Sequence, residues 1–133
     1  MASVGVRYIV DDVDAAIAFY RDRLGFELVM QPAPTFAMLT HGALRLVLSA
    51  PSTAPGGGQV QGDARPEPGG WNRFQLEVSD LEGTVAQLRA AGARFRGDIV
   101  HGVGGDQALV EDPAGNPVEL FAPTRAEAKL SDG

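Results

Sequence analysis

Two copies of one sequence pattern occur in this chain, and the repeat constrains the fold more than any other feature. The segments YIVDDVDAAIAFYRDRLGFEL and LEVSDLEGTVAQLRAAGARF follow the same plan about 68 residues apart. Each passes from an apolar strand to an acidic cap, a helix with an apolar stripe, and a glycine. The repeat therefore predicts two related modules.

The first copy predicts a helix capped by Asp11 or Asp12, since either carboxylate can accept from the free N–H groups of a first turn. Gly25 can adopt the left-handed conformation that ends a helix. The apolar stripe has helical spacing and consists of Val13, Ala16, Ile17, Tyr20 and Leu24.

The second copy predicts a shorter helix of the same kind. Ser79 and Glu82 have the spacing of a capping box, and Gly92 closes the helix. Its apolar stripe consists of Leu81, Val85 and Leu88.

Three apolar segments follow each helix and predict strands, so each module has the order βαβββ and the fold class is α+β. The predicted strands cover 26–30, 35–39 and 43–50 in the first copy and 93–100, 107–112 and 117–123 in the second. We expect a single domain over 1–124, with modules at about 1–50 and 71–123. A loop rich in Pro and Gly, 51–70, joins them, and 125–133 form a tail.

Composition excludes several classes of function. The chain has 133 residues, 44% of them hydrophobic, which suits one domain with a buried core. It contains no cysteine, so disulfides and thiolate chemistry are excluded. A net charge of -6 argues against a nucleic-acid partner, which would need a basic face. No segment approaches the ~20 apolar residues of a membrane span, and we expect a cytoplasmic protein.

The segments VDDVDAAIAFYRDRLGF, WNRFQLEVSDLEGTVAQLRAAGARF and EDPAGNPVELFAP resemble the vicinal oxygen chelate superfamily. This superfamily includes glyoxalase I, extradiol dioxygenases, fosfomycin resistance proteins and bleomycin-binding proteins. The resemblance covers nearly the whole chain. Its most specific parts are Phe19, Tyr20, Leu24, Gly25 and Phe26, and the turn Asp112, Pro113, Gly115 and Asn116 followed by Glu119. It implies that two curved mixed sheets surround a concave pocket and that two chains form a homodimer.

Strand alternation indicates which residues would line such a pocket, because side chains two apart share a face of the sheet. Trp71 precedes the strand of Arg73 and would suit stacking on a planar ligand, although a lone Trp beside a loop is more often packing. The residues expected to line the pocket and bind a ligand are Arg7, Arg45, Trp71, Arg73, Gln75, Glu119 and Phe121.

The resemblance also implies four places for metal ligands, early in the first strand and in the last strand of each module. This sequence has Gly5, Arg45, Arg73 and Glu119 there. Arginine has no lone pair to offer a metal, and catalytic zinc normally has three protein ligands. Glu119 alone would form a very weak site, so we expect no metal and no other cofactor.

Glu119 is instead expected to pair with Arg73 or Arg45 through charge-assisted hydrogen bonds. The pair could contact a ligand directly, or it could be structural and offset the burial of the carboxylate. Glu119 and Glu77 are also the carboxylates available for acid–base catalysis, with Glu119 the candidate catalytic residue.

His41 and His101 are the other metal-ligand types, and both are expected in loops, where solvated or backbone-bonded histidines are the commoner outcome. If a metal binds, Glu119 would bind it together with His41 or His101. A hydrogen bond between Arg73 and Glu119 would argue against such a site.

We predict a metal-independent protein that binds a small organic molecule, in the manner of the drug-sequestering members of the superfamily. The alternative is an enzyme that uses Glu119. It would be a divalent-metal-dependent lyase, isomerase or dioxygenase, or a cofactor-free acid–base catalyst. A regulatory or interaction subunit with a vestigial pocket is a third hypothesis, and no sequence feature favours it.

Overall fold

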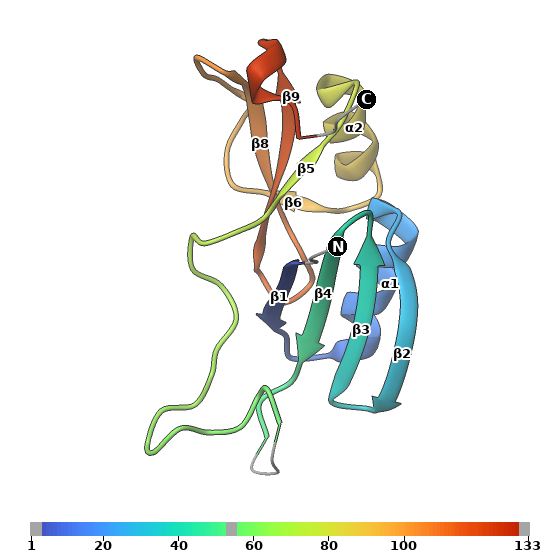
Figure 1. Ribbon diagram of the computed structural model, residues 1–133, viewed down its shortest axis with the longest axis vertical. Helices are drawn as coiled ribbons and strands as arrows, with labels where there is room; N and C mark the ends of the chain where they lie inside the picture. Colours follow the sequence, from blue (N-terminus) through green and yellow to red (C-terminus); the bar gives the residue numbers. More distant parts are fainter. Residues whose placement is uncertain (1–3, 53–55, 131–133) are drawn as a thin grey trace. The chain divides into compact units, whose positions relative to one another are not determined.

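The computed structural model describes residues 4–52 and 56–130 (Figure 1). The chain divides into two units, Met1–Gly70 with Pro113–Asn116 and Trp71–Asp112 with Pro117–Gly133. The structure of each unit is considered by itself. No helix within the described residues is long and apolar enough to cross a membrane.

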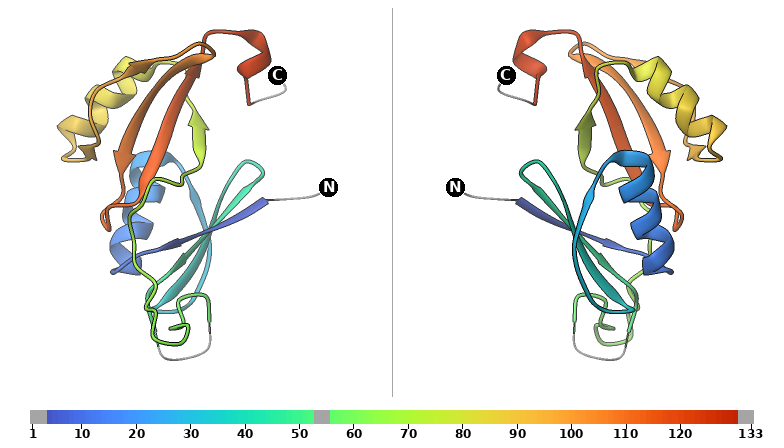
Figure 2. Two further views of the ribbon diagram at one scale, coloured as in Figure 1. Left: turned by 90° about the vertical axis from the view of Figure 1, so that its left-hand side faces the viewer. Right: turned by 90° about the vertical axis from the view of Figure 1, so that its right-hand side faces the viewer.

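The first unit has the predicted order βαβββ. Its four-stranded sheet has the order β1-β4-β3-β2, in which β1 runs parallel to β4 and the other pairs are antiparallel. Helix α1 lies against one side of this sheet (Figure 2). The elements are β1 (Val4–Ile9), α1 (Val13–Leu24), β2 (Glu27–Ala33), β3 (Phe36–His41) and β4 (Leu44–Ser49).

The ends of α1 agree with the sequence prediction. Asp12, rather than Asp11, caps the helix, because its carboxylate accepts a hydrogen bond from the N–H of Ala15 at 3.1 Å. Gly25 ends the helix with a φ of 75°, a conformation that costs other residues energy. Leu24 is only half-buried. The predicted stripe residues that are buried are Val13, Ala16, Ile17 and Tyr20.

The second unit repeats this plan with one additional short strand. Its sheet has the order β5-β9-β8-β6, with β5 parallel to β9, and β7 pairs with β8 off this path. Its elements are β5 (Gln75–Glu77), α2 (Leu81–Ala90), β6 (Arg94–Phe95), β7 (Val100–His101), β8 (Gly105–Glu111), β9 (Pro117–Pro123) and the 3-10 turn η1 (Ala126–Ala128).

Two details of the second module differ from the prediction. The segment 93–100 is not one strand, because Gly97 has a φ of 89° and bends the chain between β6 and β7. The capping box of Ser79 and Glu82 is also wrong. Asp80 caps α2 by accepting from the N–H of Gly83 at 3.0 Å, and Gly83 has no side chain with which to complete a box.

The segments outside the sheets have little regular structure. Within the predicted loop 51–70, Ser52 forms a bridge with Gln59, and Gln61 forms one with Ala64. Residues 53–55 of this loop and 131–133 of the predicted tail lie outside the described residues, as do 1–3 of the first module.

The buried side-chain amide of Asn116 connects, by hydrogen bonds, three segments of the first unit that are distant in sequence. Asn116 is 5% exposed and follows Gly115, whose φ of 93° shapes the turn between β8 and β9. Its Nδ2 donates to the carbonyl oxygen of Ile9, and its Oδ1 accepts from the N–H of Gly69, both at 2.7 Å. The side chain thus satisfies one backbone group at the end of β1 and one at the end of the loop.

We expect Asn116→Ala to lower the free energy of unfolding by about 2 to 4 kcal/mol, since each buried polar group left without a partner costs about 1 to 3 kcal/mol. Asn72, which is exposed, provides the matched control, and Asn72→Ala should stay within about 0.5 kcal/mol of the parent protein. Urea unfolding monitored by circular dichroism measures both variants. An Asn116→Ala variant as stable as the parent protein would contradict this role for Asn116.

Candidate functional site

Glu119 lies on β9 and is only 5% exposed. Its neighbours Val118 and Leu120 point to the opposite face of the sheet, where they are buried in the apolar core of the unit. In the parallel pair β5–β9, the residue opposite Glu119 is Gln75. A carboxylate in this position has lost most of its hydration and requires compensating partners.

Both oxygens of Glu119 have such partners. Arg73 donates from Nε to Oε1 at 3.0 Å, and its Nη2 lies 2.9 Å from the same oxygen. Gln75 donates from Nε2 to Oε2. Of the two arginines expected to pair with Glu119, Arg73 therefore forms the bond. These charge-assisted hydrogen bonds replace the water that the carboxylate lost on burial.

Arg73 also links this cluster to Trp71, because its Nη1 donates to the carbonyl oxygen of Trp71 at 3.1 Å. The indole ring is 66% exposed. Its partner is Arg96, whose guanidinium lies 4.6 Å from the ring centroid and which pairs with Glu111 at 2.8 Å. Sequence analysis did not identify Arg96, since no spacing or pattern connects it to Trp71.

Phe121 lies two residues beyond Glu119 on the same face of β9 and is 9% exposed. The second unit thus brings together five of the seven residues predicted to bind a ligand. They are Trp71, Arg73, Gln75, Glu119 and Phe121. The other two, Arg7 and Arg45, lie on β1 and β4 of the first unit, where both are exposed.

His101 does not join Glu119. It lies on β7 opposite Asp106 of β8, and its Nδ1 is 2.9 Å from a carboxylate oxygen of that residue. Residues paired across antiparallel strands share a face. Glu119 pairs with Leu109, three positions from Asp106, so His101 and Glu119 lie on opposite faces.

His41 ends β3 in the first unit and is exposed, with its ring 5.0 Å from that of Phe26. Within residues 4–52 and 56–130, no group of three or more His, Cys, Asp or Glu side chains is arranged to hold a metal ion. The side chains around Glu119 are a guanidinium and an amide, and the guanidinium cannot bind a cation.

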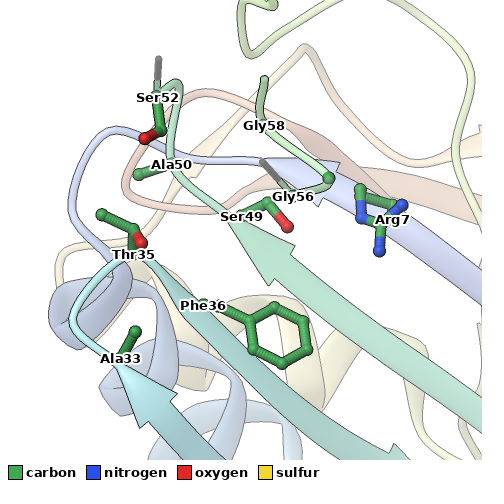
Figure 3. A pocket seen from close by; sticks show the side chains of 10 residues that line it. Arg7, Ala33, Thr35, Phe36, Ser49, Ala50, Ser52, Gly56 and Gly58 are labelled. Atoms are coloured by element: carbon green, nitrogen blue, oxygen red, sulfur yellow. The ribbon is translucent and has the colours of Figure 1, made fainter. Parts of the chain in front are cut away.

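A cavity of about 380 Å³ lies in the first unit, beside the end of β4 (Figure 3). Arg7, Phe36 and Ser49 contribute side chains to its lining, and the glycine segment 56–58 contributes backbone. Ser49 is 2% exposed, and its hydroxyl has no hydrogen-bond partner within the described part of the chain. Sequence analysis included Arg7 among the ligand-binding residues but missed Ser49, although alternation along β4 places it on the face of Arg45.

A model of the Glyoxalase/Bleomycin resistance protein/Dioxygenase superfamily matches residues 4–120. The chain belongs to this superfamily. The resemblance stated from the sequence motifs is thus confirmed. A comparison with curated protein sequences found no significant match.

Solved structures of the superfamily share this fold. A member from Sphaerobacter thermophilus DSM 20745 is 24% identical, with a TM-score of 0.74 over 92% of this chain and 97% of the other. Lactoylglutathione lyase from Agrobacterium tumefaciens is 24% identical, with a TM-score of 0.71 over 91% and 92%. TnmS3, an antibiotic binding protein from Streptomyces sp. CB03234, is 23% identical, with a TM-score of 0.69 over 93% and 97%.

Strand register refines the comparison of the two modules. Tyr8 pairs with Leu48 in the first module, and Leu76, its counterpart in the repeat, pairs with Leu120 in the second. The counterpart of Glu119 is therefore Val47, two residues from the Arg45 chosen by aligning the last strands. Valine offers no metal ligand either. The donor set of this chain does not fit the divalent metal of the metal-dependent superfamily members.

We expect Arg73→Ala to lower the free energy of unfolding by about 2 to 4 kcal/mol. Removal of one partner from a buried ion pair costs about 3 to 5 kcal/mol. The loss should be smaller here because the Arg73 side chain is 25% exposed. Adding Glu119→Gln should restore about 1 to 3 kcal/mol, since the uncompensated charge disappears.

Arg94→Ala is the matched control, because Arg94 pairs with Glu111 at 3.6 Å and is 67% exposed. Exposed pairs of this kind contribute about 0 to 1 kcal/mol. Chemical unfolding of the single variants and of the double variant yields the coupling energy. A coupling near zero would contradict a stabilising Arg73–Glu119 pair.

Proposed function

We propose that this protein binds a small organic molecule without a metal ion. The observation that carries the proposal is the hydrogen bonding of Glu119, whose two oxygens accept from Arg73 and Gln75. The superfamily resemblance assigns four positions to metal binding, and Glu119 is the residue among them whose side chain can coordinate a metal ion. Both of its oxygens accept hydrogen bonds within the protein, and a metal ion bound there would lie beside the Arg73 guanidinium.

Electrostatics support the same proposal. The positively charged guanidinium of Arg73 lies next to Glu119, where a cation would have to bind. Two like unit charges about 4 Å apart repel by about 4 kcal/mol at an effective dielectric constant near 20, and a divalent ion doubles this figure. The surroundings of Glu119 therefore favour an uncharged or anionic ligand group over a metal.

A ligand on this face of the second sheet would meet both apolar and polar groups. The exposed ring of Trp71 offers apolar surface, whereas Phe121 on the same sheet is buried. The amide of Gln75 and the guanidinium of Arg73 offer hydrogen-bond donors whose positions are fixed by Glu119. Small-molecule sites commonly combine an apolar lining with a few placed polar groups. In this proposal Glu119 orients the two donors and performs no chemistry.

The same arrangement gives little support to catalysis by Glu119. A general base must reach the proton that it removes, and both oxygens of Glu119 are already hydrogen-bonded inside the protein. The antibiotic-binding neighbour TnmS3 provides a precedent for binding within this fold. The proposal includes the homodimer that the resemblance implies, which sedimentation velocity tests directly.

We expect the protein, purified without chelator, to contain no stoichiometric Zn, Mn, Ni or Fe by elemental analysis. Calorimetric titration with the same divalent ions should give the same weak response for the parent protein and for Glu119→Gln, because the carboxylate is committed to Arg73. Small-molecule binding should be unchanged by EDTA.

Stoichiometric metal that is lost in Glu119→Gln would overturn the proposal and direct attention to lyase, isomerase or dioxygenase substrates. Arg73→Ala tests separately whether the guanidinium is what prevents metal binding. It removes the competing cation, so divalent ions should bind this variant more tightly than the parent protein if the guanidinium is what excludes them.

A further inference from the structure

Arg7 brings a positive charge to the cavity of the first unit. Its side chain forms no ion pair or hydrogen bond with any residue in the described part of the chain. Its side chain lies against the α-carbon of Gly57, so closely that a Cβ at that position would be 2.2 Å from Nε. The glycine leaves room for the guanidinium at the cavity. The position of Arg7 therefore depends on packing, and its N–H donors are not used by a protein carboxylate.

Ser49 places an unused hydroxyl beside this charge. Its Oγ is buried and has no hydrogen-bond partner among residues 4–52 and 56–130, which is uncommon because buried polar atoms are nearly always satisfied. In Figure 3 this oxygen lies on the side of β4 that faces Arg7. The hydroxyl can donate one hydrogen bond to a ligand that reaches it.

Thr35 and Ser52 add two further hydroxyl groups to the lining, and the other lining residues are apolar or contribute backbone. Phe36 presents its ring across from Arg7, and Ala33 and Ala50 add methyl groups (Figure 3). None of the described residues that line the cavity is acidic. The volume of about 380 Å³ falls within the range of roughly 300 to 1,000 Å³ typical of small-molecule pockets. One cation, several hydroxyl groups and an apolar wall match a monoanion with an apolar body.

We propose that this cavity binds the carboxylate of a small organic acid, with Arg7 as the ionic anchor and Ser49 as a hydrogen-bond donor. The carboxylate accepts two N–H hydrogen bonds from the planar guanidinium. A neutral amide cannot form a pair of hydrogen bonds of this strength with it. The apolar part of the acid packs on Phe36. The inference goes beyond the proposed function, because that function concerns Arg73 and Gln75 in the second unit and this cavity lies in the first.

The test is an NMR titration of the full chain with benzoate, phenylacetate and 3-phenylpropionate, each compared with its primary amide. At least one acid should shift the backbone amide signals of Ser49 and Gly57, and its amide should bind about 10-fold more weakly or worse. Arg7→Gln should weaken binding of that acid by about 10- to 100-fold, and Ser49→Ala by about 3- to 10-fold.

Arg23→Gln is the matched control, since Arg23 is an exposed arginine of α1 in the same unit and does not line the cavity. The affinity of this control variant for the acid should stay within about 2-fold of that of the parent protein. Thermal unfolding checks that Arg7→Gln folds, and Arg7→Lys, which keeps the charge but not the planar fork, should have intermediate affinity.

Several results would overturn the assignment. The acid and its amide could bind with equal affinity, or Arg7→Gln could bind the acid as tightly as the parent protein does. Every acid could fail to bind at millimolar concentration. Phenyl phosphate could also bind clearly more tightly than benzoate. A neutral compound that binds the protein without metal would leave the proposed function intact. Stoichiometric metal at Glu119 would overturn the proposed function but would not change this titration.

Discussion

The buried carboxylate of Glu119 is the constraint on which the arrangement of the second unit depends. A charge that is 5% exposed, on a strand whose neighbours fill the core, is tolerated only where donors replace its lost water. Arg73 and Gln75 provide those donors from the segment that becomes β5. Their bonds to Glu119 align this segment with β9, and the bond from Arg73 to the carbonyl of Trp71 extends the order to the end of the loop.

The same hydrogen bonds support the proposal that this chain binds its ligand without a metal. The fold accommodates a carboxylate at one position, and the chemistry of that carboxylate depends on what lies beside it. With histidines as neighbours it could share a metal, whereas with Arg73 as its neighbour it is committed to an ion pair. Function in this fold therefore depends on a few side chains rather than on the architecture.

The sequence predicted the features that depend on local pattern. Alternating apolar residues identified the buried faces of the strands, and glycines identified the helix ends. The cap of α2 was assigned one residue too early because Ser79 and Asp80 are both good capping residues, and only the position of the first turn distinguishes them. The bend at Gly97 was missed because a single glycine within an apolar segment does not specify its φ.

Within the candidate site, Arg73 and Glu119 could be paired because alternation and opposite charge both indicated it. The stacking of Arg96 on Trp71 and the packing of Arg7 on Gly57 could not be predicted. Each depends on the path of an irregular segment, and such a path depends on many distant contacts rather than on local pattern.

The turn Pro113–Asn116 belongs to the first unit although it connects two strands of the second. The side chain of Asn116 supplies the hydrogen-bond partners of Ile9 and Gly69, which the first half of the chain cannot supply by itself. Recombination between relatives within the loop 51–70 would therefore separate the first half of the chain from the Asn116 side chain that completes its hydrogen bonding. A first half taken from one homologue can be combined only with a second half whose β8–β9 turn carries an equivalent amide, and this requirement restricts how such proteins can diversify by exchanging modules.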